Sequence, residues 1–173
     1  MRKNAGLFIV VALVGATVSF AVALSRESEP GTAIYVTNIP KGYRDWKLIS
    51  VAREEGDLDD IRAILGNDIA IKAFREGKLP FPDGAIIARL AWTYLSSEEN
   101  NKAFGRAQSY VPGVEKNGVQ FMIKDSKKYA ATGGWAYGHF EAGKSAGEST
   151  LKTCFTCHQG NRARDYVFTQ YAH

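Results

Sequence analysis

The sequence predicts an α+β fold: a mostly antiparallel β-sheet with short helices. About five segments have the length and apolar character of strands, and they do not alternate regularly with helices. With 173 residues, 45% of them apolar and 23% charged, the chain has the composition of a folded protein. We find no internal repeat and no second linker, so we expect a single domain.

Five segments share the short length, the apolar or β-branched content and the flanking turn residues of strands. In chain order they are Lys47–Arg53, Ile61–Leu65, Ala85–Trp92, Val119–Lys124 and Trp135–Glu141. The third follows the turn Pro80–Gly84, which excludes a helix. In the fourth, the apolar residues Val119, Phe121 and Ile123 alternate with others, as in a strand with one buried face.

Helices are expected between and after these strands. A short helix capped by Asn67 or Asp68 follows the second strand, because its apolar residues recur on one face. A helical turn around Ser126–Tyr129 precedes the last strand, and Ser149–Gln159 is predicted to form a further helix. The apolar segment Tyr166–Tyr171 is expected to pack back on the domain.

The chain begins with a segment typical of export. A short basic start precedes Ala5–Leu24, which carries no charge, and residues 21–23 have the A-x-A pattern of a signal-peptidase site. We predict a signal peptide over residues 1–23, with a retained membrane anchor as the alternative, since this apolar length also spans a bilayer. Residues 24–37 are then a lead-in to a domain over 38–173, and the expected location is the periplasm.

The charge balance excludes some partners. The formal net charge is +4, and two of the positive charges lie in the first three residues, so the exported part carries +2. This is too balanced for a protein that binds nucleic acid.

Cys154-Phe155-Thr156-Cys157-His158 is a C-x-x-C-H motif, the signature of covalent haem attachment. Two thiols at this spacing can each form a thioether with one of the two haem vinyl groups, and the histidine that follows is held beneath the iron. The motif therefore predicts one haem c bound through Cys154 and Cys157, with His158 as an axial ligand of the iron.

Other uses of the two cysteines explain the motif less well. A structural zinc site needs two more ligands, and only His139 and His173 remain as histidines, with no further cysteine. A redox motif of the thioredoxin kind lies near the front of its fold, whereas this one lies near the C-terminus. A disulfide gives no reason for the histidine.

The opposite side of the iron decides between electron transfer and ligand binding. Electron-transfer cytochromes fill this position with Met or His, but no methionine follows His158, and Met122 lies within a predicted strand. His139 is a second candidate, although such a histidine is more often a hydrogen-bonded residue of the sheet. We therefore expect an open iron that binds or transforms a small molecule.

Several segments, taken in their order along the chain, resemble the cytochrome P-460 family, which includes the cytochromes c′-beta. Apart from the haem motif, these segments are Pro40–Trp46, Ile61-Arg62, Gly77 with Phe81–Arg89, Val119–Ser126, Gly134–Tyr137 and Asp165–Thr169. The resemblance implies a mostly antiparallel sheet, commonly a homodimer, and one c-type haem held by the histidine of the motif. Members of the family bind nitric oxide or carbon monoxide, or oxidise hydroxylamine.

The resemblance also implies roles for three residues outside the haem motif. Arg62 matches a distal arginine of the oxidising members, the alternative being an arginine on a solvated strand face. Arg89 aligns with a lysine that those members cross-link to the haem. Because a guanidinium stays protonated and is a poor nucleophile, we do not expect this cross-link here. Glu148 lies where some members place a proton-transfer carboxylate, the alternative being an exposed glutamate at a helix start.

The sequence thus favours a periplasmic monohaem cytochrome that binds or redox-processes nitric oxide or hydroxylamine, with a redox protein and a second copy of the chain as partners. An electron-transfer cytochrome with a filled sixth position is the alternative, and a hydroxylamine-oxidising enzyme without the lysine link is a third. Arg89 weakens the case for an enzyme, and the sequence leaves that question open.

Overall fold

The computed structural model describes residues 35–173. The predicted signal peptide, 1–23, and most of the lead-in lie outside the described residues. Among those described, no helix is both long enough and apolar enough to cross a membrane.

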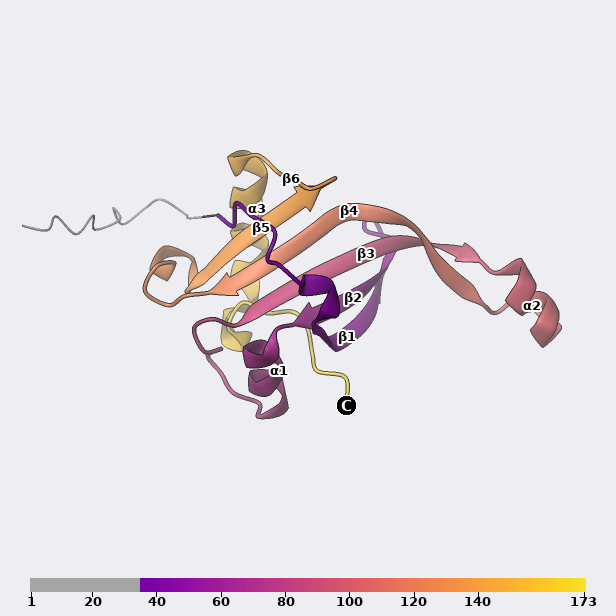
Figure 1. Ribbon diagram of the computed structural model, residues 1–173, viewed down its shortest axis with the longest axis horizontal. Coiled ribbons are helices and arrows are strands. Elements are labelled where there is room, and N and C mark those ends of the chain that lie inside the picture. Colours follow the sequence, from indigo (N-terminus) through magenta and orange to yellow (C-terminus); the bar gives the residue numbers. More distant parts are fainter. Residues whose placement is uncertain (1–34) are drawn as a thin grey trace, which may run out of the picture.

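A six-stranded antiparallel sheet forms the centre of the domain, with its strands in the order in which they occur in the sequence (Figure 1). The strands are β1 (Lys47–Glu54), β2 (Asp60–Gly66), β3 (Ile86–Ser96), β4 (Tyr110–Lys124), β5 (Trp135–Glu141) and β6 (Lys144–Ser145). The helices are α1 (Asp68–Arg75), α2 (Glu98–Phe104) and α3 (Glu148–His158), with 3₁₀ turns at Tyr43–Asp45, Ala130–Thr132 and Gln159–Arg164. The predicted α+β class is confirmed.

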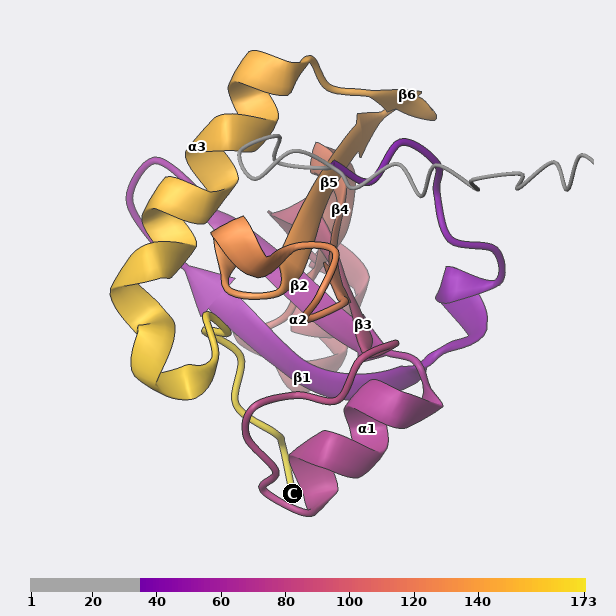
Figure 2. The same cartoon turned by 90° about the vertical axis from the view of Figure 1, so that its left-hand side faces the viewer.

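The two faces of the sheet are covered by different parts of the chain. In Figure 2, α1 and α3 lie on one side of the sheet, and the segment that leads from residue 35 into β1 lies on the other. Each side has its own apolar core, the first built around Ile49, Ile87 and Trp135 and the second around Phe121 and Phe140. The C-x-x-C-H motif lies in α3, on the first of these faces.

The start of α1 is fixed by Asn67, as expected from the sequence. Its side-chain oxygen accepts hydrogen bonds from the backbone N–H groups of Ala70 (3.0 Å) and Ile86 (3.1 Å), and its amide donates to the Gly84 carbonyl (2.8 Å). One side chain therefore caps the helix and joins it to the start of β3.

The third and fourth strands are longer than predicted. Beyond Trp92, β3 continues to Ser96, and the chain returns through α2 along the first half of β4, so that this hairpin arm projects from the body of the domain (Figure 1). The register shifts around Trp92, which marks the β-bulges where the arm bends away. The expected helical turn at Ser126–Tyr129 is a plain turn, and the 3₁₀ turn comes directly after it.

The end of the chain has no regular structure but is packed against the domain. We call residues 165–173 the tail. Val167 is buried, the ring of Tyr171 stacks on Phe74, and the N–H of Ala172 donates to the Ile49 carbonyl in β1 (2.9 Å). The expectation that this apolar end packs back is confirmed.

Candidate functional site

A cavity of about 790 Å³ lies between the sheet and the layer formed by α3 and the tail. Its floor consists of side chains from β1 to β5, and its opposite wall consists of α3 residues and tail residues 167–170. Cavities that hold cofactors and small molecules fall in the range of about 300–1,000 Å³. The site is therefore large enough for a prosthetic group.

Both cysteines of the motif line this cavity. Cys154 and Cys157 lie three residues apart in α3, so their side chains project from the same face of the helix. No disulfide joins them. Burial raises the pKa of the Cys154 thiol, which keeps it protonated at neutral pH.

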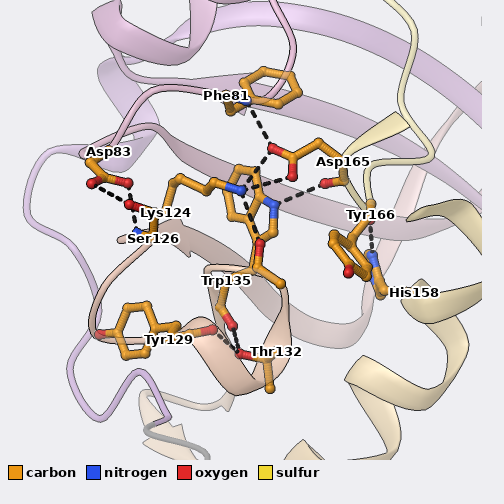
Figure 3. Close-up of polar contacts among 11 residues, drawn as sticks. Phe81, Asp83, Lys124, Ser126, Tyr129, Thr132, Trp135, His158, Asp165 and Tyr166 are labelled. Carbon is orange, nitrogen blue, oxygen red and sulfur yellow. Dashed lines mark hydrogen bonds and ion pairs between the residues drawn. The ribbon is translucent and has the colours of Figure 1, made fainter. Parts of the chain in front are cut away.

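His158, the last residue of α3, also lines the cavity, and its ring is held by the tail. Its Nδ1 lies 2.6 Å from the carbonyl oxygen of Tyr166 (Figure 3). A carbonyl only accepts, so Nδ1 carries the proton and Nε2 keeps a free lone pair, the form in which imidazole binds a metal. Burial lowers the pKa of His158 below 6.5, which favours this neutral form.

Two arginines on the floor of the cavity form a charged cluster with one buried aspartate. Asp60, fully buried at the start of β2, accepts from Arg62 Nε (2.8 Å) and Nη2 (2.9 Å) and from Arg89 Nη2 (2.7 Å). Arg62 Nη1 lies 3.3 Å from Glu54. Arg62 is thus largely buried in the cavity wall instead of lying on a solvated strand face.

The cluster leaves one donor free. Among the described residues, Arg89 Nη1 is buried and has no hydrogen-bond partner. Burial is the main cause that lowers the pKa of Arg89, and the neighbouring charge of Arg62 acts in the same direction. A buried guanidinium N–H with no acceptor is costly, so it indicates that an acceptor belongs in the cavity.

The structure does not bring Glu148 to this site. Glu148 begins α3, lies exposed, and pairs with Lys152 one turn later at 3.1 Å. A carboxylate at a helix start is favourable without any catalytic role.

The two alternative iron ligands differ in position. Met122 is buried and lines the cavity. His139 lies in β5 outside the cavity lining, with its Nε2 3.3 Å from Glu141. Within residues 35–173, no group of three or more His, Cys, Asp or Glu side chains is placed to hold a metal ion, as a zinc site would require.

Sequence reasoning missed Asp60, which organises the two arginines, and Tyr137. The Tyr137 ring lies 5.0 Å from that of His158, and burial raises the pKa of its phenol. Asp60 directly precedes a predicted strand, and a charged residue at a strand end is usually exposed. No local pattern marks it as the buried partner of two arginines.

The residues around the cavity fit a haem. Two thiols on one helix face and a neutral imidazole with a free nitrogen are the donors that haem attachment needs. The walls also include apolar residues such as Ile64, Ile87 and Val167, which suit a porphyrin. A protein-family model described as Cytochrome P460 matches residues 40–169 of the chain. A search among curated proteins found no match.

Proposed function

The chain belongs to the cytochrome P460 family and is therefore a haem protein, and we propose that it carries one covalently attached haem c and binds or redox-processes a small nitrogen oxide at an open iron. The expected ligands are nitric oxide and hydroxylamine, and the expected location is the periplasm. The observation that carries the proposal is one cavity with the Cys-His motif on one wall and two largely buried arginines on the floor.

The motif side of the cavity holds the cofactor in this proposal. Cys154 and Cys157 form the thioethers, and the free Nε2 of His158 binds the iron. When bound, the haem supplies an iron with an open coordination position and one-electron redox chemistry. The covalent bonds keep the cofactor in place in an exported protein.

The arginines bind the ligand. A nitrogen oxide gains negative charge as it is reduced, and hydrogen bonds from a guanidinium to a charged acceptor are stronger than neutral ones. Asp60 fixes both guanidiniums, so they need not reorganise when the ligand arrives. The free Nη1 of Arg89 is the donor that we assign to the ligand.

The case for turnover is weaker than the case for binding. Arg89 stands where the oxidising members carry the cross-linked lysine, and a guanidinium is a poor nucleophile. We therefore propose ligand binding as the first function. Oxidation of hydroxylamine with an artificial electron acceptor is the test for an enzyme, and its absence leaves binding as the function.

One observation favours a second candidate function, electron transfer. Met122 lines the cavity and is buried, so its thioether is available to an iron held there. In that case the resting protein is low-spin, it does not respond to nitric oxide, and Met122→Leu converts it to a high-spin form.

The proposal is tested by matched pairs of variants in protein made with the c-type maturation machinery. After denaturation, haem should stay on the wild-type chain, because it is covalently attached, and should be lost from the Cys154→Ser/Cys157→Ser chain. The His158→Ala protein should lose the absorption spectrum of a haem with a histidine ligand. The His139→Ala protein should keep that spectrum, because His139 lies outside the cavity. A reduced spectrum that does not change with nitric oxide contradicts the binding function.

A second pair of variants tests the arginines. We expect Arg89→Leu to speed nitric oxide dissociation about tenfold, because it removes the free Nη1 donor and a hydrogen bond from a charged donor contributes about 1.5–3 kcal/mol. Arg106→Leu removes an exposed arginine far along the chain and should leave the rate unchanged. Equal rates in both variants contradict the role of Arg89.

A second copy of the chain and a redox protein complete the proposal. The hairpin arm exposes large apolar side chains, among them Leu95, Phe104, Tyr110 and Val114. Two copies that cover these side chains would form the homodimer that the family resemblance implies. Sedimentation should give a dimer for the unaltered protein and a monomer for Phe104→Ser/Val114→Ser, and a monomeric unaltered protein contradicts this part.

A further inference from the structure

Lys124 and Asp165 form a buried ion pair that the proposed ligand chemistry does not use. Lys124 Nζ lies 2.8 Å and 2.9 Å from the two carboxylate oxygens of Asp165 and donates to the Gly133 carbonyl at 3.0 Å (Figure 3). The lysine side chain is 4% exposed and that of the aspartate 8%. Buried pairs of this kind are weak evidence for a stabilising role, since desolvation of the charges offsets their attraction. The pair therefore calls for another explanation.

Asp165 is held by three separate parts of the domain. Lys124 binds its carboxylate from the end of β4, and the backbone N–H of Phe81 donates to the same carboxylate at 2.8 Å. The indole Nε1 of Trp135, at the start of β5, donates to the backbone carbonyl of Asp165 at 2.8 Å. With both its side chain and its backbone bonded, this residue has little freedom to move.

The backbone at this point has an unusual conformation. Asp165 and Tyr166 both have positive φ angles, 51° and 65°, which residues with a side chain rarely adopt. Two such residues in succession are retained only where surrounding contacts impose them. The Tyr166 ring also packs against Gly133, where a Cβ would overlap it.

This conformation points the Tyr166 carbonyl at His158. The carbonyl accepts the Nδ1–H bond at 2.6 Å, the contact that sets the tautomer of the ring and directs its Nε2. The path from the ion pair to the histidine is short (Figure 3). It runs from the Asp165 carboxylate through the peptide bond to Tyr166, and the Tyr166 carbonyl oxygen then contacts the imidazole ring.

We propose that Lys124 and Asp165 are positioning residues for His158: the pair holds the Tyr166 carbonyl against Nδ1 and so fixes the orientation and basicity of the iron ligand. The inference rests on the proposed function, because it takes His158 as that ligand. Partners that accept a hydrogen bond from a ligating histidine fix its ring and raise its basicity, and their loss commonly costs about 10–100-fold in metal affinity or activity.

The test compares Asp165→Ala with Thr132→Val in the holoprotein. Thr132 is buried nearby, and its hydroxyl lies within hydrogen-bond distance of the carbonyls of Tyr129 and Trp135 but does not bond Asp165 or Tyr166. Both variants remove buried hydrogen bonds, and only the first releases the Tyr166 carbonyl. The readout is the iron–histidine stretching band in the resonance Raman spectrum of the reduced protein, which a general loss of stability does not shift.

We expect the band of Asp165→Ala to move to lower frequency and to broaden, and that of Thr132→Val to stay in place. A less basic ligand also favours the reduced state, so the ferrous-to-ferric ratio at a fixed potential should rise; each tenfold rise corresponds to 59 mV for one electron. An unchanged band in Asp165→Ala, or equal shifts in both variants, overturns the proposal.

Two further variants keep the result interpretable. If Asp165→Ala does not fold, Lys124→Met/Asp165→Asn removes both charges together, which buried pairs tolerate better than loss of one partner, and asparagine still tolerates a positive φ. A shift in this protein supports the proposal and its absence overturns it. A band that survives in His158→Ala shows that the ligand was assigned wrongly, so the proposed function fails first and separately.

Discussion

Replacement of Asp60 by asparagine should destabilise the domain strongly. Asp60 is fully buried and accepts three hydrogen bonds from Arg62 and Arg89, whose side chains are 12% and 14% exposed. Asparagine keeps the shape but removes the charge, and its amide group turns a donor toward a guanidinium. The cluster is then left with two buried positive charges and only Glu54, at 3.3 Å from Arg62, to oppose them.

The expected loss follows from these contacts. Removal of one partner from a buried ion pair costs about 3–5 kcal/mol. The lower end, about 3 kcal/mol, applies here because Glu54 still neutralises part of the charge on Arg62. At about 3 °C per kcal/mol for a domain of this size, Tm should fall by about 9 °C. The measurement is thermal unfolding of the holoprotein, followed by far-ultraviolet circular dichroism.

A matched control separates burial from pairing. Asp68 forms an equally short ion pair with Lys47, 2.7 Å, but both side chains are exposed. Asp68→Asn should therefore leave Tm nearly unchanged, and Asp60→Asn/Arg89→Met should recover part of the loss, because it removes one of the uncompensated charges. A Tm for Asp60→Asn as high as that for Asp68→Asn would refute the reasoning.

Three further predictions concern the frame around the site. Gly66→Ala should lose about 1–3 kcal/mol in urea unfolding, because its Cβ would lie 2.7 Å from the Ile49 side chain; an unchanged midpoint would show that Ile49 can move aside. Asn67→Ala should lose about 1–2 kcal/mol in the same assay through the missing cap of α1, with an unchanged haem spectrum as its control. Hydrogen bonds from the backbone N–H and the hydroxyl of Ser126 lower the folded-state pKa of Asp83 below 3.8, so its contribution to stability is present above that pH and is lost as pH falls through the folded-state pKa. The Tm of Asp83→Asn should therefore lie below that of wild type at pH 7 and converge with it in acid, and a constant difference would contradict the assignment.

Local patterns in the sequence were sufficient to predict most of the strands and helices outside the hairpin arm. The strand Trp135–Glu141 has the predicted bounds, and the helix with the haem motif differs by one residue at each end. The strand follows from a local signal, the pair Gly133-Gly134 that precedes it. The fold class follows from signals of the same kind, because strand-like segments that do not alternate with helices form antiparallel sheets.

The hairpin arm could not be predicted in this way. The first half of β4 contains Pro112 and Gly113, which usually interrupt strands, and α2 is short and has no buried residues. Pro112 and Gly113 are tolerated because the arm is a two-stranded ribbon largely in solvent. A missing hydrogen bond between the strands, or a glycine, disturbs no core there.

The sequence identifies the motif residues of the candidate site but not the contacts that hold them in place. The motif identifies Cys154, Cys157 and His158 by spacing alone, whereas the contacts that hold them in place join residues far apart in the sequence. Lys124 and Asp165 are separated by 41 positions. Pairing of this kind becomes visible only when the strands and the tail are placed together.

The tail gives the cavity a wall whose stability differs from that of its floor. The floor is a sheet whose central strands are bonded on both sides, so we expect hydrogen exchange there to require unfolding of the whole domain. Beyond Val167, the described tail makes one backbone–backbone hydrogen bond, from Ala172 to Ile49, and the Thr169 carbonyl accepts a bond from the Arg164 side chain. Amides of residues 168–171 should exchange through local opening, at a small fraction of the free energy of global unfolding. We therefore expect this wall to open locally while the sheet stays folded, which gives the haem a way into the cavity before the proposed thioethers form.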